Sequence, residues 1–244
     1  MNPRRIGIAF AAVGLAALCA LASEPWKQKS FEKWTAADVR QVLQNSPWAK
    51  ASKAPYVPQL NGDKPEGGVG VKIGTVPDVT LSDTPVDATH ATLHPDTTVV
   101  IRWNSSLTVR RALYRDAVLA GEKEADAAER FLNTPPENIE FVMTAAADSL
   151  LPPIEPSSLE PETFLLMSPS GMKIPAKHAK VHQETDVHGR TGYIFEFPRT
   201  RTDGSSIVAE GTSYIEFQCR MGARMFRARF KPADMVGADG ADLR

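Results

Sequence analysis

An alternating pattern on both sides of Gly222-Ala223 constrains the fold of this chain more than any other feature of its sequence. Every second residue is apolar before and after this dipeptide: Ile215, Phe217, Cys219, Phe226, Ala228 and Phe230. Alternate residues of a strand share one face, and a two-residue type II′ turn at Gly222-Ala223 would place Cys219 opposite Phe226. The sequence therefore predicts a β-hairpin with one buried apolar face.

The other face of the predicted hairpin is polar and mainly basic. The same register places Glu216 opposite Arg229, which is a favourable cross-strand pair of opposite charges. The basic residues of this face are Arg220, Arg227, Arg229 and Lys231. If this face takes part in an interface, these four cations are candidate binding residues.

The pattern is regular from Thr97 to the end of the chain. Residues 97–103 are β-branched and apolar enough to form a central strand. Helical spacing of apolar residues then predicts one long helix over 106–133, which could bend or split at Gly121. Further strands are predicted at 139–143, 163–167, 173–184, 191–198, 206–210, 213–220 and 225–231. Residues 97–244 are therefore expected to form an α+β domain with a mostly antiparallel sheet.

Residues 23–50 are predicted to form a short N-terminal helical segment. Thr35 is a favourable N-cap, Asp38 gives a near capping box, and Pro47 ends the helix. Trp34 and Trp48 flank this helix, either to dock it on the main domain or to bind a partner protein. We favour docking, because isolated helices of this length are marginal in water. In the alternative, the two tryptophans are candidate binding residues.

Residues 51–96 are rich in proline and glycine and poor in large apolar residues. Such a composition is typical of an extended linker or of an irregular segment that wraps around a domain. We therefore expect 51–96 to separate the N-terminal helical segment from the α+β domain.

Residues 1–22 have the three parts of a cleavable signal peptide. Arg4 and Arg5 precede an apolar run, and Ala20-Leu21-Ala22 matches the small-x-small cleavage pattern before Ser23. The apolar run is shorter than the roughly 20 residues of a membrane span. A lipoprotein with lipid on Cys19 is the other alternative, but Leu18 stands where a small residue is usual. The sequence predicts export to the periplasm or secretion.

The composition after cleavage limits the partners of the chain. Removal of Arg4 and Arg5 leaves 26 basic and 29 acidic residues, which gives no electrostatic case for nucleic-acid binding. Cys219 becomes the only cysteine, so no internal disulfide is expected, and its position predicts a buried residue rather than a reactive thiol. No other segment is apolar enough to predict a transmembrane span.

The densest group of potential metal ligands lies around His178 and His182, followed by Glu184, Asp186 and His188. Histidine and carboxylate can bind zinc, but the spacing fits no established motif. Lys180 would also point the same way as the two histidines if 178–182 is a strand. A solvated strand face, with Ala179 and Val181 buried opposite, explains the pattern without a metal. No cofactor is expected.

Two serines fit the S-x-x-K motif of penicillin-binding proteins, at Ser30–Lys33 and Ser170–Lys173. The companion motifs S-D-N and K-T-G are absent from the sequence, and Ser170 lies in a P-S-G stretch typical of a turn.

Trp34-Thr-Ala-Ala-Asp-Val39, leading to Ser46-Pro-Trp-Ala-Lys50, resembles the opening of a group of uncharacterised secreted bacterial proteins. The ending from Phe230 to Met235 (F-x-x-x-D-M) is also similar to theirs. The W-x-x-x-D-V part is in addition similar to GWxTD-domain proteins, although the F-W-x-x-R-D segment is missing. The resemblance implies an exported envelope protein and assigns no catalytic residues.

These observations favour a non-enzymatic module that binds another envelope protein or a surface polymer. The alternative is an extracytoplasmic hydrolase whose site is assembled from residues far apart in the sequence. A deep pocket lined by converging acidic, histidine or serine side chains would favour the hydrolase. A shallow apolar patch near Trp34 and Trp48 would favour the binding module.

Overall fold

The computed structural model describes residues 24–54, 96–122, 132–134, 136–146, 149, 151–183 and 191–243. The expected signal peptide lies outside the described residues, and so do residues 55–95 of the expected linker. In the part of the chain that is described, no helix has the length and apolar character needed to cross a membrane.

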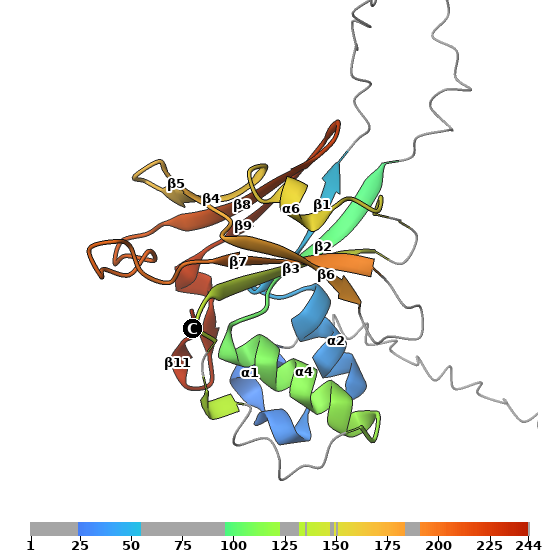
Figure 1. Ribbon diagram of the computed structural model, residues 1–244. Helices are drawn as coiled ribbons and strands as arrows, with labels where there is room; N and C mark the ends of the chain where they lie inside the picture. Colours follow the sequence, from blue (N-terminus) through green and yellow to red (C-terminus); the bar gives the residue numbers. More distant parts are fainter. Residues whose placement is uncertain are drawn as a thin grey trace, which may run out of the picture.

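The chain has an α+β fold built on two antiparallel sheets (Figure 1). The larger sheet has the strand order β1 (Ala49–Ala54), β2 (Thr97–Trp103), β3 (Ile139–Ala145), β7 (Thr191–Phe197) and β6 (His178–Gln183). The smaller sheet has the order β5 (Met172–Pro175), β4 (Thr163–Ser168), β8 (Tyr214–Met221) and β9 (Arg224–Phe230). The prediction of mostly antiparallel pairing is confirmed, but the strands divide into two main sheets.

The predicted C-terminal hairpin is confirmed in its register. Strands β8 and β9 pair Cys219 with Phe226 and Glu216 with Arg229. Gly222 has φ 58°, the positive value that a primed two-residue turn requires at its first central position. All six apolar side chains of the pattern are buried.

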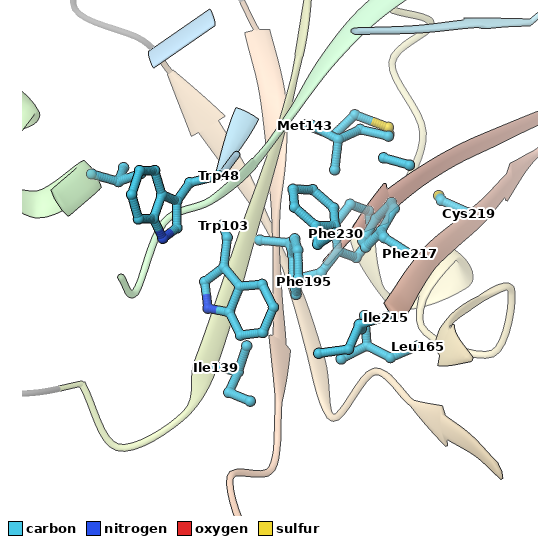
Figure 2. Close-up of a cluster of buried hydrophobic side chains, with 14 of the residues drawn as sticks. Trp48, Trp103, Ile139, Met143, Leu165, Phe195, Ile215, Phe217, Cys219 and Phe230 are labelled. Carbon is cyan, nitrogen blue, oxygen red and sulfur yellow. The ribbon is translucent and has the colours of Figure 1, made fainter. Parts of the chain in front are cut away.

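The buried face of this hairpin packs against the larger sheet. The ring of Phe217 on β8 lies 5.3 Å from that of Phe141 on β3 and 5.5 Å from that of Phe195 on β7, measured between centroids. Phe230 on β9 lies 5.2 Å from Phe141. Figure 2 shows Phe195, Phe217 and Phe230 in the same cluster as Leu165 and Ile215 of the smaller sheet. The core is therefore the layer between the two sheets.

The two sheets approach each other at β1 and β9, which lie side by side. The backbone N–H of Arg227 donates to the hydroxyl of Ser52 at 3.0 Å. Ala51–Ala54, which we expected to begin the linker, are therefore the last four residues of β1 and belong to the α+β domain.

The chain passes from one sheet to the other between β5 and β6. A single strand over 173–184 is wrong, because Pro175 ends β5 in the smaller sheet and His178 begins β6 in the larger one. The link is held by backbone bonds from Ala176 to Thr163 and from Lys177 to Glu196. The strand expected at 206–210 is also wrong, since Ser206 forms only an isolated bridge with Thr200.

Helices α1 (Pro25–Gln28), α2 (Ala36–Gln44) and α4 (Leu107–Leu119) gather with the 3-10 turn η1 (Phe31–Lys33) at one end of the strands (Figure 1). The short helix α6 (Pro156–Leu159) lies apart from them, against β6, and leads into β4. In α2 the predicted capping box is confirmed, because Thr35 and Asp38 each accept the other's backbone N–H. Helix α4 ends at Leu119, just before Gly121 at φ 75°, the position at which the helix predicted over 106–133 was expected to bend or split. Residues 123–131 lie outside the description.

The C-terminal residues close over the start of α4. After the 3-10 turn η3 (Pro232–Asp234), strands β10 (Val236–Gly237) and β11 (Gly240–Ala241) form a small hairpin. Asp242 then accepts hydrogen bonds from the backbone N–H groups of Leu107 and Thr108. Ser106 caps the next free donor, the N–H of Val109. The end of the chain thus completes the N-terminal cap of α4.

Candidate functional site

The two tryptophans named as candidate binding residues are core residues. Trp34 and Trp48 are 2% and 0% exposed, and the Trp34 indole donates to the carbonyl oxygens of Pro25 and Lys29. Trp26, from α1, makes an edge contact with Trp48 at 5.7 Å between ring centroids. The expectation that the N-terminal segment docks is confirmed. The alternative of a tryptophan patch open to a partner is wrong, because both rings are covered by the protein itself.

The four cations of the hairpin lie together on an open surface. Arg220 lies on β8, and Arg227 and Arg229 lie on β9. All three point away from the core, since the two sequence neighbours of each are buried. Lys231 continues the alternation just beyond β9 with an extended backbone. All four side chains belong to exposed residues.

Two neighbouring strands extend this surface. The pairing of β4 with β5 and with β8 places Leu166 between Lys173 and Glu216. Lys173 is exposed and therefore adds a fifth cation. We call this set the cationic face; it consists of Arg220, Arg227, Arg229, Lys231 and Lys173.

Partly exposed aromatic rings support two of the cations. The guanidinium carbon of Arg229 lies 4.9 Å from the ring centroid of Tyr214, and Lys173 Nζ lies 4.8 Å from that of Phe164. Cations at such distances are attracted by the negative face of the ring. Each cation therefore covers part of a ring that is itself only partly exposed.

Glu216 lies beneath the cations in the middle of this face. Its side chain is 5% exposed, while that of Arg229, with which it forms an ion pair, is 66% exposed. Gln218 donates a second hydrogen bond to the same carboxylate. This ion pair raises the pKa of the Arg229 guanidinium. A buried carboxylate thus fixes an exposed arginine, whose outer N–H groups remain toward solvent.

Glu162 is the acidic side chain beside Arg220, at 3.5 Å, and both are about half exposed. Ion pairs this open contribute little and are easily exchanged for another anion. The cationic face therefore keeps an excess of positive charge on a chain whose net charge is −1.

The predicted histidine group is only partly within the described residues. His178 and His182 lie on β6 and point to the same face as Lys180, as predicted. Val181 was expected to be buried opposite them but is 53% exposed, because β6 is the last strand of its sheet. Glu184, Asp186 and His188 lie outside the described residues. Among those that are described, no three His, Cys, Asp or Glu side chains converge as metal ligands would.

A carboxylate pair that sequence reasoning missed lies at one end of the larger sheet. Glu140 on β3 is directly opposite Glu196 on β7. Glu196 is bound by Lys180 and by Asn138, whose amide nitrogen lies 3.1 Å from it. Burial and the charge of Glu196 raise the pKa of Glu140. Two carboxylates with different environments could act as acid and base, but only the strand pairing, which the sequence does not reveal, brings them together.

The small hollow beside α4 does not have the character of an active site. Its volume is about 130 Å³, and its acidic side chains are Asp239 and Asp242. Asp239 pairs with Arg111 at 2.6 Å, and Asp242 caps α4. Asp242 therefore anchors the residues after β11 to α4, and Asp239 adds a surface ion pair beside the turn between β10 and β11.

The remaining motif residues have structural positions. Cys219 is buried, and this burial raises the pKa of its thiol to about 12. Ser170 lies in the turn between β4 and β5, where its hydroxyl donates to the carbonyl oxygen of Met167. Ser30 precedes η1 as its N-cap residue.

Comparison of the chain with protein-family models, with curated proteins and with solved structures found no match.

Proposed function

We propose that this protein is an exported, non-enzymatic module of a bacterial envelope that binds an anionic partner through its cationic face. The observation that carries the proposal is the open row of cations over the buried Glu216, with Arg229 fixed in its centre. Cations spread over the exposed face of a sheet suit a macromolecular contact, whereas small substrates are usually held in concave pockets. The partner is another envelope protein or a surface polymer.

Site-specific photo-crosslinking in the native envelope tests the proposal. A photoreactive amino acid at position 227, in the cationic face, should give a specific product. The same amino acid at position 40, which is exposed on α2, should not. The product should also disappear when Arg220 and Lys231 are both replaced by Gln. Equal products from both positions, or a product that survives the double replacement, would refute the assignment of this surface.

Export is tested separately. N-terminal sequencing of the protein recovered from the envelope or medium should begin at Ser23 or within a residue or two of it. A chain that retains Met1, or one that carries lipid on Cys19, would contradict signal-peptide cleavage at this site.

The second candidate function is an extracytoplasmic hydrolase, and the pair Glu140–Glu196 is the observation that favours it. The raised pKa of Glu140 is what a general acid requires. A panel of chromogenic esters, peptides and glycosides, assayed with the wild type and with Glu140→Gln, would test this function. Turnover that is lost in Glu140→Gln, although the variant unfolds like the wild type, would support the hydrolase.

A further inference from the structure

The spacing of the cations on β9 indicates how anionic groups would have to be spaced on the partner. Arg227, Arg229 and Lys231 occupy alternate positions, and Lys231 keeps extended dihedral angles of φ −102° and ψ 113°. A strand rises about 3.3 Å per residue, so successive cations of this row stand roughly 6.5–7 Å apart. They form one row of exposed cations along β9.

An extended peptide has the same repeat. Its alternate side chains also share one face at roughly 6.5–7 Å, because the geometry of an extended chain is the same in any strand. Aspartate or glutamate at every second position would therefore meet one cation each. A block of consecutive acidic residues in an extended peptide would turn half of its carboxylates away.

The centre of the row is fixed before any partner binds. Arg229 is held by Glu216 and by the ring of Tyr214, so little of its side-chain freedom remains to be lost on binding. Arg227 and Lys231 on either side are exposed and can adjust to the partner.

Apolar insertion into a membrane is not favoured by this surface. The exposed large hydrophobic residues in the described part of the chain are Leu119, at the end of α4, and Val181, on β6. Neither belongs to the smaller sheet. The aromatic rings of the cationic face are partly covered by their own cations.

We propose that the cationic face binds an extended acidic peptide segment, with Asp or Glu at alternate positions, that lies along β9. This inference rests on the proposed function and specifies the chemistry of its partner. The binding should weaken as salt is added, because exposed charges are screened.

Fluorescence anisotropy with the full mature chain tests this inference. One labelled peptide has three Glu residues that alternate with Thr, and a second has the same composition with the three Glu residues in one block, so that at most two of them face the row of cations. An exposed ion pair changes affinity by a factor of about 1.4 to 5, so the alternating peptide should bind about threefold tighter or more. Vesicles containing phosphatidylglycerol form a third arm of the experiment.

A pair of double variants locates the binding. Arg227→Gln with Lys231→Gln should weaken the alternating peptide about fivefold, since two exposed ion pairs are removed. The matched control, Lys33→Gln with Arg40→Gln, removes the same charge from exposed residues of the helical end and should have little effect. An equal loss in both variants would overturn the inference.

The other outcomes separate this inference from the function on which it rests. Equal affinity for the two peptides would overturn the requirement for acidic residues at alternate positions. The cationic face would then bind anions without regard to their spacing. Binding to the vesicles alone would overturn it in favour of a membrane surface. Failure of all three ligands would also overturn it, while the crosslinking from position 227 decides the proposed function independently.

Discussion

The indole Nε1 of Trp48 donates a hydrogen bond to the backbone carbonyl oxygen of Asp242, which lies 2.9 Å away and 194 positions later in the sequence. The same aspartate uses both carboxylate oxygens for the first two N–H groups of α4, at 2.8 and 2.6 Å. One C-terminal residue therefore ties the N-terminal segment to helix α4. The N-terminal helices are thus an integral part of the domain.

Replacing Asp242 should loosen this connection. Asp242→Ala leaves two helix N–H groups without their charged acceptor, and removal of a helix-capping side chain costs about 0.5–2 kcal/mol. We expect a loss of about 2 kcal/mol in the free energy of unfolding, measured with urea. Asp239→Ala is the control. Its side chain is 64% exposed and pairs only at the surface, so a cost above about 1 kcal/mol there would contradict this account.

The hairpin register predicts opposite results for two neighbouring positions. Phe217→Ala should cost about 3–5 kcal/mol, because it opens a cavity between Phe141 and Phe195. Arg227→Ala should cost less than about 0.5 kcal/mol, since the side chain is exposed. Denaturant unfolding of both variants checks the comparison. A larger loss for Arg227→Ala would show that the outer face of the smaller sheet is buried against a partner in solution.

Glu140 should make stability depend on pH. Its pKa is raised above the ordinary value of 4.5 by burial and by Glu196. The folded protein therefore binds this proton more tightly than the unfolded chain does. The contribution of Glu140 to stability is complete below about 4.5 and is lost as the pH rises through the raised pKa.

Glu140→Gln should remove this pH dependence. At pH 7 the variant should be at least as stable as the wild type, because one of two like charges placed opposite each other is gone. Unfolding at several pH values between 4 and 8 measures the difference. If the variant is less stable than the wild type at every pH, the ionised carboxylate contributes a contact that outweighs the repulsion.

Cys219 should be inert toward thiol reagents in the folded protein. Burial raises the pKa of its thiol to about 12, so almost no thiolate forms at pH 8. Labelling with a disulfide reagent should be slow in buffer and complete in denaturant. Ser205→Cys, at an exposed position, provides a fast-reacting control. Rapid labelling of the native wild type would mean that β8 opens readily.

Local patterns in the sequence were enough for the hairpin and for the start of each long helix. The alternation around Gly222-Ala223 fixes which side chains oppose each other, since a shift by one residue would move every apolar side chain to the wrong face. Thr35 with Asp38 predicts the start of α2, because a cap depends on residues three positions apart. The spacing of apolar residues predicts the start of α4 near residue 106. These features are determined within about twenty neighbouring residues.

The tertiary structure alone decided which strands pair and what each polar side chain meets. Glu140 and Glu196 are 56 positions apart, and their pairing follows from the choice of β7 as the neighbour of β3. In the sequence, Pro175 indicates the end of a strand, but it does not indicate that the chain then passes from the smaller sheet to the larger one. The burial of Glu216 within an outer face likewise depends on neighbours from several strands. Packing of the whole core sets such contacts, and short-range propensity does not encode them.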